Sequence, residues 1–528
     1  MAWVPIDNVG KLGVIKDVAD HSLPPEAWTT ANNIRFDDNG AAKIEGHAVP
    51  TSLGTPSVTP HFCMPLATSS DVHWIYGSLS KLYGVNDDVH KDLTRASGGD
   101  YNTNVDSGWV GAVKSGIAIL TNGVDEPQFW AGDFATPTKF ASLTNWPASV
   151  TCRSIKAFKN FLVAVNVTKS GTHYPHMVKW SHPAVPGALP SSWDETDATK
   201  DAGEVDIAET DGFCVDSLPL GDINVIYKED SCYAMQFIGG QNIFRFPAIS
   251  RSAGIISENC ATNTPGGHIV LTADDLILNN GRDIISIVDG VLRKELFDDI
   301  DLSLSQRCFV VTNPAKSEVW VCYPETDQSC CTKALIYNYK EKTFTFRELP
   351  QLAHAAIGKF VSTLTDETWD ADSGVWDDDS EIWDARGLGD TFKLIGASPN
   401  GVGLLTQFDL TNQDNGANTT TTLERTGLAL LGTDRQGQPK VDYDNIKFCR
   451  GVRPLLEGSA SLSIHVATSM TRNETPVWHG PFTYDPSTDL EVNCQVAGRF
   501  FGVRFSSTGN QSWNLKGYEL DLELMGGY

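Results

Sequence analysis

Residue types that often carry catalysis are present in this sequence but do not form a familiar site. The 12 histidines are scattered. His173 and His176 lie in a GTHYPH stretch whose proline indicates a surface turn. A phosphate-binding glycine loop, an HExxH motif, paired zinc-binding cysteines and a GxSxG nucleophile are all missing. We therefore expect no catalytic residues, no metal site and no cofactor, and interpret the chain as not an enzyme.

Carboxylates are abundant, and a pair of them is what a glycosidase needs. The sialidase aspartate box, S-x-D-x-G-x-T-W, is approached by DSGVW at 372–376, which is one residue short and occurs once. Calcium binding by nearby carboxylates stays open, although Asp370 and Asp372 do not continue into a D-x-D-x-D-G loop. A carbohydrate-binding or glycan-cleaving, sialidase-like protein acting at the host surface is thus the alternative function.

Three Trp-Asp pairs begin at Trp369, Trp376 and Trp383, seven residues apart. A coiled coil needs two apolar positions per heptad, and this stretch has one among Asp, Ser and Gly, which are poor helix formers. The Trp-Asp repeats of propellers are about 40 residues apart instead. We interpret 368–386 as a short inserted loop. It packs either on itself or on a neighbouring subunit, because tryptophan is enriched at interfaces.

The elements around these residues show strand periodicity. YELDLEL at 518–524 alternates apolar and acidic residues, as a half-buried strand does. Turns at 280–281 (Asn-Gly) and 340–342 (Lys-Glu-Lys) predict tight hairpins. Such hairpins recur about every 40–50 residues, which favours a β-propeller over a stack of sandwiches. The best helix candidate is 23–33, with Ser22 as its cap.

The predicted fold class is all-β: a β-propeller with a C-terminal β-sandwich-like domain and a short inserted Trp-Asp loop. Residues 1–50 are expected to hold an N-terminal segment and the first propeller strands. Residues 51–417 are expected to form the propeller, with the insertion near 360–390. A turn-rich NQDNGAN stretch then leads into 418–528, the expected ring-forming sandwich.

The formal net charge is −26, from 40 basic and 66 acidic residues. A protein that grips DNA needs a basic face, so tight binding of nucleic acid is not expected. An acidic channel would instead let DNA slide without sticking. The 11 cysteines, odd in number and without CxxC spacing, are expected to be reduced and mostly buried. We expect neither a signal peptide nor a membrane anchor.

Several stretches, in this order, resemble the tail nozzle (tail tubular) and tail hub proteins of short-tailed bacteriophages of the podovirus type. The resemblance spans nearly the whole chain, and none of the matching stretches carries a catalytic residue. The matching stretches are 17–49, 179–203, 225–246, 272–287, 334–350 and 498–528.

The resemblance implies a structural virion protein, made in the bacterial host cytoplasm and located in the virion tail. It would form a homohexameric ring below the portal and an adaptor (head-completion) protein, retain the packaged genome, and conduct it during ejection. Double-stranded DNA would pass through the lumen without tight binding, and tail fibre, spike or needle proteins would dock. A generic propeller interaction module, which would act as a monomer, is the third reading. The candidate interface residues are Trp28, Arg35, Trp369, Trp376, Trp383 and Tyr528.

Overall fold

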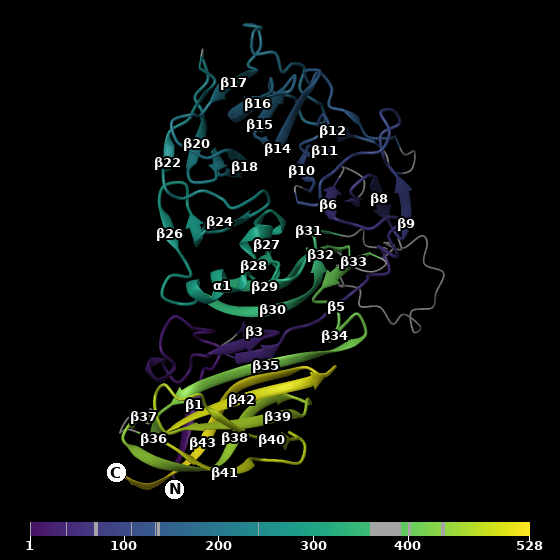
Figure 1. Cartoon of the computed structure of the whole chain (residues 1–528). Coiled ribbons are helices and arrows are strands. Elements are labelled where there is room, and N and C mark those ends of the chain that lie inside the picture. Colours follow the sequence, from purple (N-terminus) through teal and green to yellow (C-terminus); the bar gives the residue numbers. More distant parts are fainter. Residues whose placement is uncertain are drawn as a thin grey trace, which may run out of the picture.

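The computed structural model describes residues 2–37, 40–67, 72–106, 108–132, 134, 138–240, 242–359, 392–399, 403–433 and 439–527. Within these residues, helical structure is limited to α1 (Arg293–Asp299) and the 3-10 turns η1 (Asp20–Ser22) and η2 (Leu302–Arg307). Nearly all other regular structure is strand, which confirms the predicted all-β class (Figure 1). None of the described helices combines the length and the apolar character that crossing a bilayer requires.

Seven antiparallel sheets follow one another along the middle of the described chain, and Figure 1 shows them arranged in a ring. Sheet one is β6 (Phe62–Ala67), β7 (Val72–Gly77), β8 (Leu82–Asn86) and β9 (Val89–Asp92). Sheet two is β10 (Val110–Lys114), β11 (Ile117–Thr121), β12 (Gln128–Trp130) and β13 (Ala141–Ser142). Sheet three is β14 (Val150–Phe158), β15 (Phe161–Lys169), β16 (Thr172–Trp180) and β17 (Gly203–Asp206).

Sheets four to seven complete the ring. Sheet four is β18 (Cys214–Leu220), β19 (Ile223–Lys228), β20 (Cys232–Phe237) and β21 (Phe244–Arg245), with β22 (Ala248–Ser250) also paired to β20, and sheet five is β23 (Ala261–Thr264), β24 (Gly267–Leu271), β25 (Leu276–Asn279) and β26 (Ile284–Ser286). Sheet six is β27 (Phe309–Asn313), β28 (Glu318–Tyr323), β29 (Cys331–Asn338) and β30 (Thr343–Leu352). Sheet seven is β31 (His354–Gly358), β32 (Lys393–Ser398), β33 (Leu404–Phe408) and β5 (His47–Ala48).

The last sheet packs against the first. Strand β31 contacts β6, and the rings of Phe62 and His354 lie 4.6 Å apart between them. The indole nitrogen of Trp74 also donates to the carbonyl of Lys359 at 3.1 Å. Within the seventh sheet the outermost strand is β5, which comes from the start of the chain. Sheet order and closing contacts favour the interpretation as a seven-bladed propeller, and the sixth sheet continues from β30 through β2 (Thr30–Asn32) into strands near the C-terminus.

The predicted hairpins are confirmed. Strand β29 pairs with β30 across the Lys340–Lys342 turn, with Asn338 opposite Thr343. Strands β25 and β26 pair across Asn280-Gly281, where Gly281 has φ +86°. That left-handed conformation suits glycine because a side chain would be strained there.

The two ends of the chain build a β-sandwich together, and purple N-terminal strands lie among yellow C-terminal strands in Figure 1. One layer is β3 (Ile34–Asp37), β4 (Gly40–Lys43), β43 (Trp513–Gly527), β38 (Asn445–Gly458) and β41 (Val492–Gly498), with β1 (Ala2–Asp7) on β43. The other is β2 (Thr30–Asn32), β35 (Ala417–Leu428), β42 (Phe500–Gly509), β39 (Leu462–Ser469) and β40 (Val477–Tyr484). Short strands β34 (Gln413–Asp414), β36 (Leu430–Thr433) and β37 (Pro439–Val441) flank them.

Two predictions for the N-terminal region are wrong. Residues 23–33 form no helix: they run from the end of η1 into β2, which pairs with β35 and, at Asn32, with Phe346 of β30. Nor do residues 1–50 supply the first propeller strands, because β1 to β4 join the sandwich and only β5 joins the ring. In both cases the partners lie hundreds of residues away, and their pairing overrides the local helix signals.

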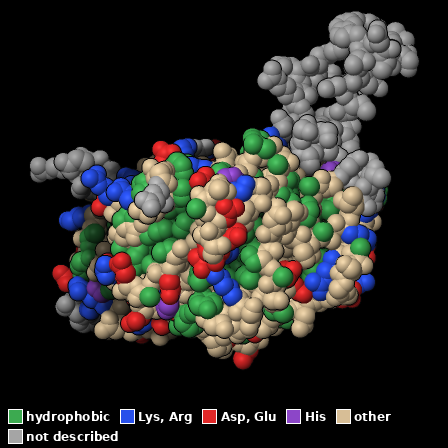
Figure 2. All heavy atoms as spheres, turned by 90° about the horizontal axis from the view of Figure 1, so that it is seen from above, with side chains coloured by type: hydrophobic (Ala, Val, Ile, Leu, Met, Phe, Trp, Pro, Cys, Tyr) green, Lys and Arg blue, Asp and Glu red, His purple; other side chains and the backbone are tan. Residues whose placement is uncertain are grey.

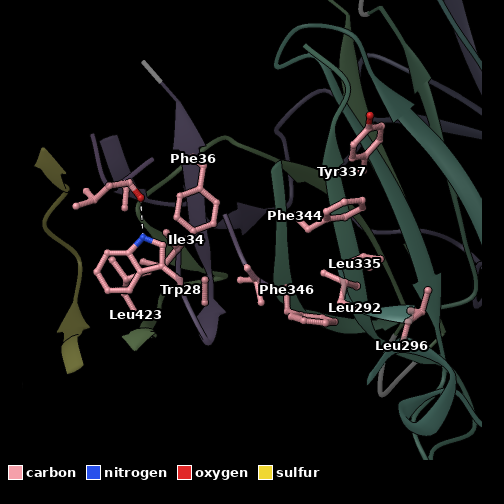
Figure 3. Packing of buried hydrophobic residues seen from close by; sticks show 14 of the residues in the cluster. Trp28, Ile34, Phe36, Leu292, Leu296, Leu335, Tyr337, Phe344, Phe346 and Leu423 are labelled. Atoms are coloured by element: carbon pink, nitrogen blue, oxygen red, sulfur yellow. Dashed lines mark hydrogen bonds between the residues drawn. The ribbon is translucent and has the colours of Figure 1, made fainter. Parts of the chain in front are cut away.

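Sandwich and ring share one buried cluster. Figure 3 shows Trp28, Ile34 and Phe36 from the N-terminal segment facing Phe344 and Phe346 of β30. Because apolar surface is removed from water on both sides of this joint, the two parts are held as one body.

Candidate functional site

A pocket of about 300 Å³ lies where the first strands of several ring sheets begin. Its wall includes Phe62 and Trp109 from sheets one and two, and Phe309 and His354 from sheets six and seven. Propellers commonly leave a central channel at this place. The pocket is therefore the candidate functional site of the ring, and the question is what its charged groups do.

Ion pairs cross this region between sheets that are not neighbours. Arg307, two residues before β27, donates to the Oδ1 atom of Asp106, before β10, at 2.8 Å and 2.6 Å. Arg153 of β14 pairs with Glu258, before β23, through bonds that include one of 3.1 Å. These contacts link sheet six to sheet two and sheet three to sheet five, so they narrow the space along the axis of the seven-sheet ring.

The remaining polar groups of the pocket are held neutral by burial. Burial lowers the pKa of His354 to about 3, and the positive charge of Lys156 adds to this effect. Burial also lowers the pKa of His61 and raises the pKa of the Cys308 thiol to about 12. The pocket thus combines paired charges, neutral imidazoles and protonated thiols. That combination suits a structural plug better than proton transfer near neutral pH.

Arg35 occupies a second cluster of charges, at the joint between sandwich and ring. Its guanidinium, on β3, donates to both carboxylate oxygens of Glu318 on β28 at 2.5 Å and 3.1 Å, and to Asp409 at 3.1 Å. Arg347 of β30 also reaches Asp409, at 3.4 Å, and donates to the carbonyl of Glu45 at 2.8 Å.

Burial and charge oppose one another in this cluster. Burial alone would lower the pKa of Arg35, but Glu318 and Asp409 raise it above its ordinary value. Burial would raise the pKa of Asp409, and Arg35 and Arg347 instead lower it below its usual range. The cluster is therefore charged at neutral pH. It fixes the sandwich to the ring, because separating them would leave buried charges without partners.

Two of the predicted interface residues are buried and make their contacts within the chain. Trp28 is 1% exposed, and its indole nitrogen donates to the carbonyl of Val9 at 2.6 Å (Figure 3). Arg35 is 7% exposed and paired as described above. A surface offered to another molecule cannot be formed by these two side chains, so the prediction is wrong for them, and the interface that they do form lies within the chain.

The other candidate interface residues lie outside the described residues: Trp369, Trp376, Trp383 and Tyr528. The predicted Trp-Asp loop lies outside them too, so calcium binding there stays open. Within the described ranges, no group of three or more His, Cys, Asp or Glu side chains could hold a metal ion. All 11 cysteines are free, and all except the half-buried Cys330 are buried, as expected.

Sequence reasoning missed the residues that cross the ring axis. Arg307, Asp106, Arg153 and Glu258 carry no motif, and their only common signal is position, in or just before the first strand of a ring sheet. That signal becomes readable only once the sheet boundaries are known.

Comparison of the sequence with protein-family models gives no match. Comparison with curated proteins gives no significant match either.

Proposed function

We propose that the chain is a structural subunit of a short-tailed phage tail. In this proposal several copies, six by the resemblance, form a nozzle or hub ring below the portal and adaptor. This ring of copies, as distinct from the seven-sheet ring within each copy, extends the DNA channel, retains the packaged genome and conducts it during ejection. The stretches that resemble tail nozzle proteins suggest this role, and the architecture supports it through the features argued below.

The observation that carries the proposal is the division of charge between two rigidly joined parts. The sandwich segments 1–43 and 418–528 hold 18 acidic and 14 basic residues, whereas 44–417 hold the other 48 acidic and 26 basic residues. Ten of those 48 acidic residues lie in 360–391, outside the described residues. A nearly neutral part can approach further copies with little repulsion, whereas an acidic part repels DNA and keeps it sliding. On the face drawn in Figure 2, Lys and Arg side chains lie among Asp and Glu side chains.

The ion pairs across the axis of the seven-sheet ring indicate where a DNA channel would lie in this proposal. Because the Arg307–Asp106 and Arg153–Glu258 pairs span the middle of the seven-sheet ring, DNA would not thread a single chain. The conduit would instead be the space that several copies enclose, each presenting the outside of its own ring. The buried joint around Arg35 suits this role, since a channel wall must not flex between its two parts under the pressure of packaged DNA.

Electron microscopy of the purified chain, alone and mixed with its candidate adaptor protein, tests the proposal. Six-fold particles with a central opening wide enough for a DNA duplex are expected. A chain that stays a single copy under both conditions, and that binds a member of a glycan array, would instead support the carbohydrate-binding alternative.

A further inference from the structure

Two thiols of the sandwich lie within reach of each other. The sulfur atoms of Cys449 on β38 and Cys494 on β41 are 3.5 Å apart and share a hydrogen bond. The two strands pair antiparallel, with an irregularity between Cys449 and Gly451 that brings Cys494 beside Cys449. The residue directly opposite Cys449 is Val496, and Cys494 lies in the irregularity two residues before it, so the closeness of the two thiols is shown by the contact of their sulfur atoms. A bond between these sulfurs therefore needs only a small movement of the side chains.

Both thiols are buried, but Cys494 lies nearer to solvent than Cys449. Cys494 lines an open groove of about 820 Å³ between β40 and β41, with Trp478, Phe482 and Gln495 among the other lining residues. Cys494 is 8% exposed, while Cys449 behind it is fully buried. A small reagent that enters the groove would meet the sulfur of Cys494 first.

The pKa shifts of the two thiols also indicate that Cys494 reacts before Cys449. As a thiol, Cys494 donates to the sulfur and the carbonyl oxygen of Cys449. Once ionised, it accepts a hydrogen bond from the Cys449 thiol instead, and this bond lowers the pKa of Cys494 below its usual value, helped by nearby backbone amides and opposed by burial. The same bond, together with burial, raises the pKa of Cys449 well above its usual value. Because the thiolate is the reactive form of cysteine, Cys494 is the better nucleophile of the pair.

We propose that Cys494 and Cys449 form a redox-active dithiol, which a small disulfide such as oxidised glutathione converts into a disulfide bond between β41 and β38. The inference rests on the geometry of the sandwich and does not depend on the proposed function.

The reaction proceeds by two exchanges. The Cys494 thiolate attacks one sulfur of oxidised glutathione, breaks its S–S bond, and releases one glutathione thiolate, which takes up a proton. Cys449 then gives up its proton and attacks the Cys494 sulfur of this mixed disulfide, and the second glutathione leaves as a thiol. Two cysteine thiols are oxidised, and one glutathione disulfide is reduced to two thiols.

The new bond would fasten an outer strand to the middle of its sheet. Strand β41 is the end strand of its layer, whereas β38 pairs with β43 along most of its length. The disulfide would therefore hold the groove wall in place and resist fraying of this edge.

Mass spectrometry of the native full chain tests the inference. The protein is incubated with oxidised glutathione, its free thiols are alkylated in denaturant, and trypsin is added. Trypsin cuts after Arg450 and Arg472 and so places the two cysteines on separate peptides. We expect one linked pair of peptides, containing Cys449 and Cys494, that separates on reduction.

Two variants test the order of attack. Cys449→Ser should trap glutathione on Cys494, because the resolving thiol is missing. Cys494→Ser should leave Cys449 free of glutathione. Cys330→Ser removes the half-buried thiol and serves as the matched control, since it should keep the linked peptides.

The inference would be overturned if wild-type Cys449 and Cys494 were both alkylated after a treatment that glutathionylates Cys330. The order of attack would be overturned if Cys449 in Cys494→Ser took up glutathione as readily as Cys494 does in Cys449→Ser. Wild-type protein also provides a readout without any variant: its urea midpoint should rise on oxidation and return on reduction, and an unchanged midpoint in cross-linked protein would contradict the fastening of the edge.

Discussion

Arg35 of the N-terminal strand β3 forms a two-bond ion pair with Glu318 of the ring strand β28, across 283 residues of sequence. The pair and its neighbour Asp409 are buried at the joint between the sandwich and the ring. The start of the chain is thereby tied to the sixth and seventh ring sheets, and the two parts of the molecule are fixed to each other.

Replacing Arg35 by methionine should strongly destabilise the protein. The change leaves the buried Glu318 carboxylate without its guanidinium partner and leaves Asp409 with Arg347 as its remaining one, and breaking a buried ion pair costs about 3–5 kcal/mol. Urea unfolding followed by fluorescence measures the loss. The matched control is Arg282→Met in the exposed turn before β26, which should stay within about 0.5 kcal/mol. Equal effects of the two variants would show that the joint does not depend on Arg35.

The same cluster predicts a dependence of stability on pH. Arg35 and Arg347 hold the pKa of Asp409 below its usual range despite burial, so its ionised form stabilises the folded state. This contribution is complete above the unfolded pKa of about 3.9 and is lost as the pH falls through the lower folded value. Asp409→Asn should therefore be less stable than wild type at neutral pH, and the difference should shrink below about pH 4.

Urea midpoints measured from neutral pH down to about pH 3 provide the comparison. Asp283→Asn, at an exposed position, should follow the wild-type curve throughout. A difference between wild type and Asp409→Asn that stays constant over this range would rule out the depressed pKa as its source.

The contact across the ring axis should appear as coupling between Arg307 and Asp106. A double-mutant cycle with alanine at both positions should give a coupling energy of about 0.5–1 kcal/mol, because both side chains are partly exposed to water. The exposed pair Arg251–Glu209, at 3.4 Å, should give a value near zero. If the axial pair were no more strongly coupled than this control, the ring axis would not be held closed by it.

Trp28→Phe separates an internal role of this residue from an intermolecular one. The substitution leaves the carbonyl of Val9 without its indole donor, which should cost about 1–3 kcal/mol. Because the side chain is 1% exposed, the number of copies in any assembly should not change. Thermal melts measure the first effect and sedimentation measures the second. A variant that melts like wild type but fails to assemble would place Trp28 at a surface after all.

Local signals in the sequence predicted local structure well. The Asn280-Gly281 and Lys340–Lys342 turns fold as expected, because each joins strands that are adjacent in the chain. The alternation of 518–524 likewise appears in β43 for Tyr518, Leu520 and Leu522, which are buried, but not for the last apolar residue, Leu524, which is exposed.

Features that depend on distant partners were not predicted. The segment 23–33 was expected to be a helix, but its strand is stabilised by β35 and β30 far along the chain. Arg35 and Asp409 are 374 residues apart, and no local pattern pairs them. The same holds for the axial ion pairs, whose members are brought together only when the ring closes.

In the proposed function, copies of this chain assemble around a DNA channel which none of them contains alone. Negative-stain electron microscopy of the full chain, alone at rising concentration and mixed with its candidate adaptor protein, tests it most directly. We expect six-fold rings with an opening wide enough for a DNA duplex, bounded by the outer surfaces of the subunits. Particles that remain single copies in both samples, or an opening that runs through the middle of each seven-sheet ring, would contradict it.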